Sequence, residues 1–214
     1  MNHEQILRMA ADFPYFLREF WGAMDLDKYG QIGWFEEDIA HFVQHGPERR
    51  GVLAYRSSGK THFITTAYSC WRLYRDPDWK ISIFSKSAGF AGRITGYVRD
   101  AIGICPFLQH LKPSKDAKTG RDQKDTAIEF VVTGAAASKQ PSVRGIGIGS
   151  QTAGNRANTI IADDIEDETN SMTVDARDRL FNAAVSLNAQ LFKVNEDIPL
   201  DDPTNQRDMI FVGY

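Results

Sequence analysis

The amino-acid sequence predicts an α/β protein with a mainly parallel central sheet, flanked by helices and preceded by an N-terminal helical segment. Short runs rich in Val, Ile and Phe are typical of buried strands, and they occur at 51–55, 80–85, 127–132, 159–162 and 209–213. Helical stretches alternate with these runs, at 60–75, 87–104 and 173–192. Such alternation is typical of a parallel sheet that is covered on both faces.

The first 47 residues carry a helical pattern of apolar side chains. These side chains recur at steps of three and four, first at Ile6, Met9, Phe13, Phe16 and Leu17, then at Phe35, Ile39, Phe42 and Val43. The second helix should end near His45, because Gly46 and Pro47 follow it. We therefore predict a helical lead-in over 1–47 and an α/β unit over 48–214.

Three further segments complete this prediction. Segment 112–126 is polar and mixed in charge, which indicates an exposed loop or hairpin. Segment 144–155 is rich in glycine, and we expect it to be irregular. The helix over 173–192 has one apolar side, formed by Val174, Leu180, Phe181, Ala184, Leu187 and Leu191.

Composition excludes several classes of protein. The chain has 214 residues, enough for one substantial domain with a real core. Its net charge of −3 excludes a broadly basic, histone-like protein. No apolar run approaches the roughly 18 residues that span a bilayer, and no secretory signal is visible. Two cysteines make neither a disulfide framework nor a four-ligand zinc site, so we expect a reduced, cytoplasmic-type chain with no membrane partner.

The segment AYRSSGKT at 54–61 matches the phosphate-binding motif G-x-x-x-x-G-K-[ST] (Walker A) except at its first position. Gly59 lets the backbone wrap a phosphate, Lys60 reaches the β- and γ-phosphates, and Thr61 places a hydroxyl on Mg²⁺. A chance turn is the alternative, but the strand before and the helix after favour the motif. We expect ATP and Mg²⁺ here, with ATP held by Ala54, Tyr55, Arg56, Ser57, Ser58, Gly59, Lys60 and Thr61.

Arg56 is unusual inside such a loop. It is either an ordinary exposed side chain, or its guanidinium lies along the γ-phosphate and stabilises transition-state charge in cis. We count it among the candidate catalytic residues.

The apolar run at 159–162 ends in carboxylates, in the sequence TIIADDIEDE. In P-loop ATPases such a strand (Walker B) holds the Mg²⁺ shell, and a neighbouring acid orients the attacking water. We assign Asp163 to the metal shell and Asp164 to the water, with Glu166 as a competing base. An ordinary acidic loop is the alternative. The 103 residues between Lys60 and Asp163 suit the RecA/ASCE-like branch of P-loop NTPases, in which a strand is inserted between the two motif strands.

Together these residues resemble a known family. AYRSSGKT, the segment 142–167 and MIFVGY at 209–214 are similar to the ATPase half of phage large terminase subunits, and most of all to the DNA maturase B type of short-tailed phages. The arginine in the phosphate loop and the aspartate pair are typical there. The likeness covers nearly the whole chain. It departs from the family after Gly213, where Tyr214 stands in place of the usual Thr-Pro.

This resemblance implies a motor that uses ATP hydrolysis to drive double-stranded DNA into a preformed capsid. It implies a homo-oligomeric ring, a portal protein and a small terminase subunit as partners, and action in the host cytoplasm. It points to Gln44 or its neighbourhood for adenine recognition, and to an arginine from a neighbouring subunit, with Arg144 and Arg156 as candidates. Both arginines are equally well explained as surface residues. The nuclease domain of the family is not expected within these 214 residues.

Two other functions stay open at this point. One is a helicase-like remodelling ATPase, which would need a second RecA-like domain. The other is a nucleotide-binding assembly module that hydrolyses little ATP. If the chain contacts DNA, the net charge of −3 restricts that contact to a small basic rim, with Arg93, Arg99 and the 112–124 loop as candidates.

Overall fold

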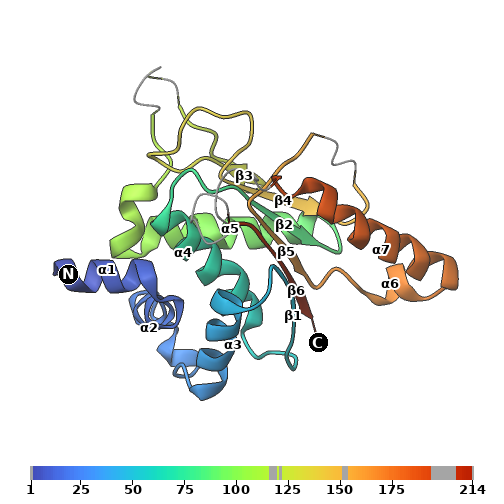
Figure 1. Cartoon of the computed structure of the whole chain (residues 1–214), viewed down its shortest axis with the longest axis horizontal. Helices are drawn as coiled ribbons and strands as arrows, with labels where there is room; N and C mark the ends of the chain where they lie inside the picture. The colour runs from blue at the N-terminus through green and yellow to red at the C-terminus, as the bar shows by residue number, and fades with distance from the viewer. Residues whose placement is uncertain (1, 116–119, 121, 151–153, 194–205, 214) are drawn as a thin grey trace.

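The computed structural model describes residues 2–115, 120, 122–150, 154–193 and 206–213. Its centre is a six-stranded sheet in the order β1-β6-β5-β2-β4-β3, shown in Figure 1. Every neighbouring pair is parallel except β3 with β4. The strands are β1 (Arg49–Leu53), β2 (Ile81–Ser85), β3 (Glu129–Phe130), β4 (Val143–Gly147), β5 (Thr159–Asp163) and β6 (Asp208–Gly213). The predicted fold class is confirmed.

The N-terminal segment is helical, as predicted, but it forms three α-helices in place of two. These are α1 (His3–Ala11), α2 (Phe13–Ala23) and α3 (Trp34–His45), with a short 3₁₀ turn at Leu26–Tyr29. Asp12 divides the first pattern, because its carboxylate accepts the Tyr15 N–H at 3.1 Å and so caps a new helix. Pro14 favours the same start, since it fits the first helical turn.

The remaining helices lie on both sides of the sheet. On one side, a π-helical turn at Thr61–Thr66 continues into α4 (Ala67–Arg75), and α5 (Ala88–Ile104) leads to a 3₁₀ turn at Pro106–Leu111. On the other side lie α6 (Glu168–Ser171), α7 (Val174–Ser186) and a 3₁₀ turn at Leu187–Gln190 (Figure 1). Within the described residues, no helix is long and apolar enough to cross a membrane.

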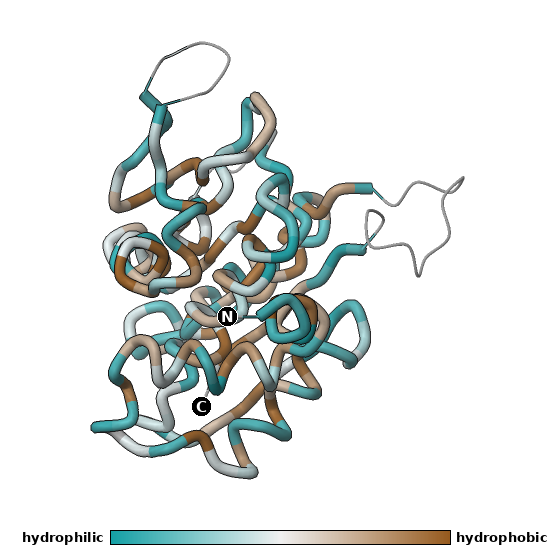
Figure 2. The backbone as a smooth tube through the Cα atoms, turned by 90° about the vertical axis from the view of Figure 1, so that its left-hand side faces the viewer, coloured by the Kyte–Doolittle hydropathy of each residue, from teal (hydrophilic) through white to brown (hydrophobic). Residues whose placement is uncertain are grey.

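The core is unequal on the two faces of the sheet. The larger apolar cluster joins α1–α5 to the strands, so the N-terminal helices share one core with the sheet. The smaller cluster, around Phe84 and Ile160, is closed by Leu187 and Leu191. Figure 2 shows hydrophobic and hydrophilic residues alternating along the backbone, with hydrophobic stretches running through the middle of the molecule.

The apolar side predicted for residues 173–192 is only partly buried. Leu187 and Leu191 enter the core, but Val174 is 62% exposed and Phe181 is 67% exposed. The helix forms because Thr173 caps it, its hydroxyl accepting the Ala176 N–H at 3.1 Å.

The glycine-rich segment 144–155 is also corrected, because its first part is the buried strand β4. Gly145 and Gly147 lie where α5 crosses the sheet closely. A Cβ atom on Gly145 would stand 2.6 Å from the Thr95 hydroxyl oxygen, and one on Gly147 would stand 2.7 Å from the Ala88 nitrogen. These glycines therefore permit close packing and do not break the strand. Conversely, the run at 127–132 shortens to β3, which pairs antiparallel with β4.

The sheet order confirms an extra strand between the two motif strands, although this strand does not come from the segment that links the motifs. β6 lies between β1 and β5, while β2, β4 and β3 lie beyond β5. The parallel strands end at the same edge of the sheet. Leu53, Ser85, Asp163 and Gly213, the last residues of β1, β2, β5 and β6, therefore meet there.

A buried charge cluster closes the opposite edge. Asp208 receives hydrogen bonds from Arg50 at 2.7 Å, Tyr68 at 2.8 Å, Thr159 at 2.7 Å and Arg72 at 3.1 Å. All five side chains are buried, and they join β1, β5 and β6 to α4. Burial, followed by the Asp208 charge, raises the pKa of Tyr68 far above its usual value. The cluster is fully hydrogen-bonded at Asp208, as a buried charge requires.

Candidate nucleotide-hydrolysis site

The loop at 54–61 folds as a turn that opens directly into a helix. The Ala54 N–H donates to the Gly213 carbonyl at 3.0 Å, which ties the loop to the end of β6. Ser57 and Gly59 have φ values of 63° and 79°, so the backbone reverses over three residues. The N–H groups of His62 and Phe63 then both donate to the Gly59 carbonyl, at 2.7 and 3.1 Å. A turn of this shape exposes backbone N–H groups to an anion.

Lys60 joins the loop to the acidic end of β5. Its side chain is buried, with 7% of the residue exposed, and its Nζ lies 3.9 Å from Oδ1 of Asp164. The two motifs that the sequence places 103 residues apart therefore meet in space.

Asp163 is fully buried, and its two carboxylate oxygens differ in environment. Oδ2 accepts a hydrogen bond from the Thr65 hydroxyl at 2.7 Å, whereas Oδ1 has no hydrogen-bond partner among the described residues. Burial raises the pKa of Asp163 from 3.8 to about 6. The nearby Asp164 charge raises it further, while the hydroxyls of Thr65 and Thr61 and the Lys60 ammonium oppose the shift.

Thr65 is a site residue that the sequence reasoning missed. It stands four residues after Thr61, so both hydroxyls lie on one face of the opening helical turn. The four-residue spacing from Thr61 is the feature of the sequence that indicates Thr65 as a site residue.

At Asp164, directly after Asp163, the backbone leaves the direction of β5. Its φ of 46° is left-handed, and its N–H donates to the Val212 carbonyl at 3.0 Å. This turn directs the carboxylate toward Lys60 and the cavities beyond. Glu166 is exposed and lines the same two cavities, of about 480 and 340 Å³. Both candidate bases therefore face open space next to the loop.

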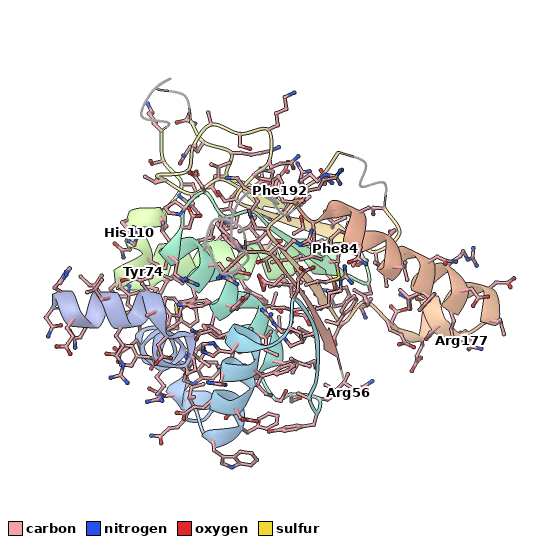
Figure 3. All side chains as sticks on the ribbon, viewed as in Figure 1. Arg56, Tyr74, Phe84, His110, Arg177 and Phe192 are labelled. Carbon is pink, nitrogen blue, oxygen red and sulfur yellow. The ribbon has the colours of Figure 1, made fainter. Side chains whose placement is uncertain are left out.

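Arg56 lies on the rim of the larger of these two cavities. That cavity also contains Asp164, Glu166 and Glu168, over a floor that includes Leu53 and Phe211. Figure 3 shows Arg56 at the margin of the molecule, near the carboxyl end of β1. The structure thus brings Arg56 to the acidic strand end, and its role beside the γ-phosphate stays a prediction.

A third cavity, of about 600 Å³, lies on the other side of the loop. Its loop wall is formed by Tyr55, Ser57, Ser58 and Gly59, and its outer wall by Trp21, Leu26, Lys28, Gly30, Gln31, Ile32 and Glu36. The Trp21 indole N–H donates to the Gly30 carbonyl at 2.8 Å, which holds the outer wall in place. The sequence alone did not show that the N-terminal segment would face the loop.

Gln44 does not line any of these three cavities, and its expected role in adenine recognition stays a prediction. Its carboxamide oxygen accepts the Phe13 N–H at 2.7 Å, and its NH₂ group donates to the Ala11 carbonyl at 2.8 Å. Both bonds satisfy backbone groups at the break between α1 and α2. Gln44 therefore serves the packing of the N-terminal helices.

The two arginines expected to act across a subunit interface are bonded within this chain. Arg144 donates to Glu129 through Nε at 2.7 Å, and it also contacts Asn155. Arg156 donates to the Ala189 carbonyl. Neither lines a cavity at the loop, so neither reaches the site of its own chain. Their role in trans stays a prediction.

The donor set around Asp163 fits a hard cation with few protein ligands. Among the described residues, no group of three or more His, Cys, Asp or Glu side chains could hold a metal ion. Mg²⁺ is commonly held by one or two protein oxygens, together with waters and phosphate oxygens. The unbonded Oδ1 of Asp163 and the Thr61 hydroxyl provide such a set.

A relative in sequence agrees with the resemblance noted above. No protein-family profile matches the chain. The chain is 36% identical over 187 residues to a "Terminase, large subunit" of Enterobacteria phage T3, a match that covers 87% of this chain and 30% of that relative. The chain therefore spans about a third of that relative's length.

Similar solved structures include the HK97 bacteriophage large terminase, with a TM-score of 0.48 and 15% identity, covering 86% of this chain and 34% of that one. A variant of the large terminase ATPase domain of Thermus phage P74-26 has a TM-score of 0.44 and 14% identity, covering 86% of this chain and 81% of that domain.

Proposed function

We propose that this chain, which is related over most of its length to a phage terminase large subunit, is the ATP-hydrolysing motor domain of a DNA-packaging terminase. The observation that carries the proposal is the meeting of the phosphate loop, Lys60 and the Asp163–Asp164 pair at one edge of the sheet. A phosphate cradle beside two carboxylates is what phosphoryl transfer to water needs.

In this proposal the loop binds the triphosphate of ATP. The N–H groups around Ser57–Gly59 and the Lys60 ammonium face the phosphates, and the dipole of the helix that follows adds to their field. Thr61 and Asp163 would hold Mg²⁺, which neutralises charge on the β- and γ-phosphates when it is bound. The buried Oδ1 of Asp163, which has no hydrogen-bond partner among the described residues, then gains a partner in the cation.

The nucleoside end of ATP fits the 600 Å³ cavity better than the surroundings of Gln44. This cavity begins at Ser57–Gly59 and has aromatic and apolar walls from Tyr55, Trp21 and Ile32. An adenine ring gains from such walls by stacking and by burial of apolar surface. We therefore place adenine recognition on the segment 21–36.

Hydrolysis then requires one water and one base. The water oxygen forms a bond to the γ-phosphorus, the bond from that phosphorus to the β–γ bridging oxygen breaks, and ADP and phosphate result. The carboxylate of Asp164, or that of Glu166, accepts the proton of the water and passes it to solvent. The guanidinium of Arg56 stabilises the charge that spreads over the γ-phosphate oxygens.

At the level of the assembled motor, several copies would form a ring around double-stranded DNA in the host cytoplasm. The portal protein and the small terminase subunit would be its partners, and Arg144 or Arg156 would complete a neighbouring site. The sequence relative supports this role because it is itself a terminase large subunit.

The direct test is the ATPase activity of the Lys60→Ala chain. We expect hydrolysis to disappear while the melting temperature stays close to that of the wild type, because Lys60 contacts phosphate and is not part of the apolar core. Lys139→Ala serves as a matched control, since it removes an exposed lysine that lines none of the three cavities around the loop. Unchanged turnover in Lys60→Ala would remove the phosphate-loop assignment.

A further inference from the structure

The 340 Å³ cavity beside the acidic strand end has two walls of opposite charge. One wall carries Asp163, Asp164 and Glu166, next to Thr61. The other carries Lys86, at the end of β2, with Phe90 and Arg93 on the first turns of α5. The proposed hydrolysis reaction uses the first wall and gives no role to the second.

The two cations of the second wall are held against one aromatic ring. The Lys86 Nζ lies 4.1 Å from the Phe90 ring centroid, and the Arg93 guanidinium carbon lies 4.0 Å from it. Contact with a ring face fixes a cation but leaves many of its N–H donors available. Two cations on one ring also repel each other, and an anion that binds both relieves this repulsion.

Lys86 and Arg93 differ in the charged partners that they have besides Phe90. Lys86 also pairs with Asp167, at 3.7 Å, and both side chains are partly exposed. Arg93 forms no ion pair with any residue that the structure describes. A guanidinium with unpaired charge at the mouth of a cavity is a strong donor for phosphate oxygens.

We propose that Lys86 and Arg93 bind a phosphate group, and that this group is the free phosphate cleaved from ATP, held before it leaves the site. The inference rests on the proposed function. The cavity shares Thr61, Asp163 and Asp164 with the hydrolysis site, whereas Tyr55 and Ser57–Gly59 line the 600 Å³ cavity, and His62 is common to both cavities. It therefore lies beyond the γ-phosphate end of the nucleotide.

The same cations could take a phosphate from the DNA backbone, but the surroundings favour the free ion. DNA affinity depends on several clustered cations that release counterions. Here two cations face three carboxylates across a small cavity, so an anion must be compact enough to stay on the cation side, next to the proposed Mg²⁺ position, whereas an extended anionic strand would run past the carboxylates.

The test compares the full chain with Arg93→Gln and Lys86→Gln. Inhibition of ATP hydrolysis by inorganic phosphate should weaken about tenfold in Arg93→Gln, as expected for loss of a charge-assisted hydrogen bond. Inhibition by ADP should stay unchanged. Isothermal titration of inorganic phosphate into the ADP-saturated chain gives a second readout that does not depend on turnover, and the phosphate affinity should fall by the same factor.

Two controls separate charge and ion-pair effects from binding. Arg18→Gln removes an arginine that pairs with Glu37 on α2–α3, far from the cavity, and it should behave as the wild type. Asp167→Asn removes the Lys86 ion pair but keeps a side chain that can cap α6. If Asp167→Asn weakens phosphate binding as much as Lys86→Gln does, the effect belongs to the ion pair and the inference is wrong.

Duplex-DNA binding by fluorescence anisotropy distinguishes the two phosphate sources. If Arg93→Gln loses DNA affinity but keeps normal phosphate inhibition and titration, the cations contact DNA and the inference fails. If the wild-type chain hydrolyses no ATP at any protein concentration, the proposed function fails. In that case a phosphate titration that weakens in Arg93→Gln would still support the anion site.

Discussion

Asp163 combines full burial with an oxygen that lacks a hydrogen-bond partner among the described residues, so its ionised form is costly in the free chain. Its pKa is raised from 3.8 to about 6 by burial. Such a cost is common where a residue is arranged for function and not for stability. In our proposal Mg²⁺ offsets it.

This residue predicts a pH dependence of stability without metal or nucleotide. The folded chain keeps the Asp163 proton at pH values where the unfolded chain has lost it, so the free energy of unfolding falls as the pH rises from about 4 to about 6. Asp163→Asn should remove this dependence and stabilise the chain at pH 7 by on the order of 2 kcal/mol. Urea unfolding at pH 5 and pH 7 in EDTA measures both effects. A wild-type chain that becomes more stable relative to Asp163→Asn over this range contradicts the assignment.

The neighbouring carboxylates should differ from Asp163 in their kinetic effects. Asp164→Asn should keep Mg²⁺–ATP binding but lower kcat by about 10²–10⁴-fold, because only the proton acceptor is lost. Asp163→Asn should instead weaken Mg²⁺–nucleotide binding. Glu166→Gln is the matched comparison, since it faces the same cavities. If it stalls hydrolysis and Asp164→Asn does not, Glu166 is the base.

At the scale of elements, the charge cluster at Asp208 holds β1, β5, β6 and α4 together at the edge away from the site. Asp208→Asn should destabilise the chain by about 3–5 kcal/mol, because two buried arginines lose their counter-charge. Asp100→Asn breaks an exposed ion pair with Arg99 and should cost less than about 1 kcal/mol. Equal, small changes in the urea midpoints of both variants would show that the cluster does not stabilise the sheet.

The contact of β4 with α5 depends on the absence of a side chain at Gly145. Gly145→Ala places a Cβ atom 2.7 Å from the Ala91 carbonyl oxygen, and backbone must move to accommodate it. We expect a loss of about 1–3 kcal/mol from such overpacking. Gly96→Ala, on α5, meets no atom within 4 Å and should stabilise the chain by up to about 1 kcal/mol. Thermal melts of both variants should therefore shift in opposite directions.

At the scale of the whole molecule, the site opens along one edge of the sheet, and the candidate trans arginines lie away from it. If a neighbouring copy supplies an arginine, the ATPase rate should rise more steeply than linearly with protein concentration. An ATPase rate that stays linear in protein concentration argues for a site completed within one chain or for a module that hydrolyses little ATP.

Mixed samples identify the arginine. Arg144→Ala and Arg156→Ala chains are each mixed with inactive Asp164→Asn chains, which still carry both arginines. Hydrolysis should return in the mixture whose partner lacks the arginine that acts in trans. Arg56→Ala chains provide the control, because a residue that acts in cis cannot be replaced by a neighbour.

The sequence by itself determined the local parts of this protein. The phosphate loop, the helix after it and the carboxylates after β5 are contiguous in the chain, and short-range patterns specify contiguous structure. The same holds for the lead-in helices and for most strands. The sequence pattern was misleading at β4, because the same glycines that indicate a loop also allow a helix to pack closely on a strand.

Only the tertiary structure decided which distant segments meet. Nothing local indicates that β6 enters the sheet between β1 and β5, that Gln44 joins α1 to α2, or that Trp21 faces the phosphate loop. The pairing of Lys86 and Arg93 on Phe90 depends in the same way on where β2 ends beside α5. Such contacts follow from the order of strands and the packing of helices over them, which depend on the burial of the whole core and not on any one segment.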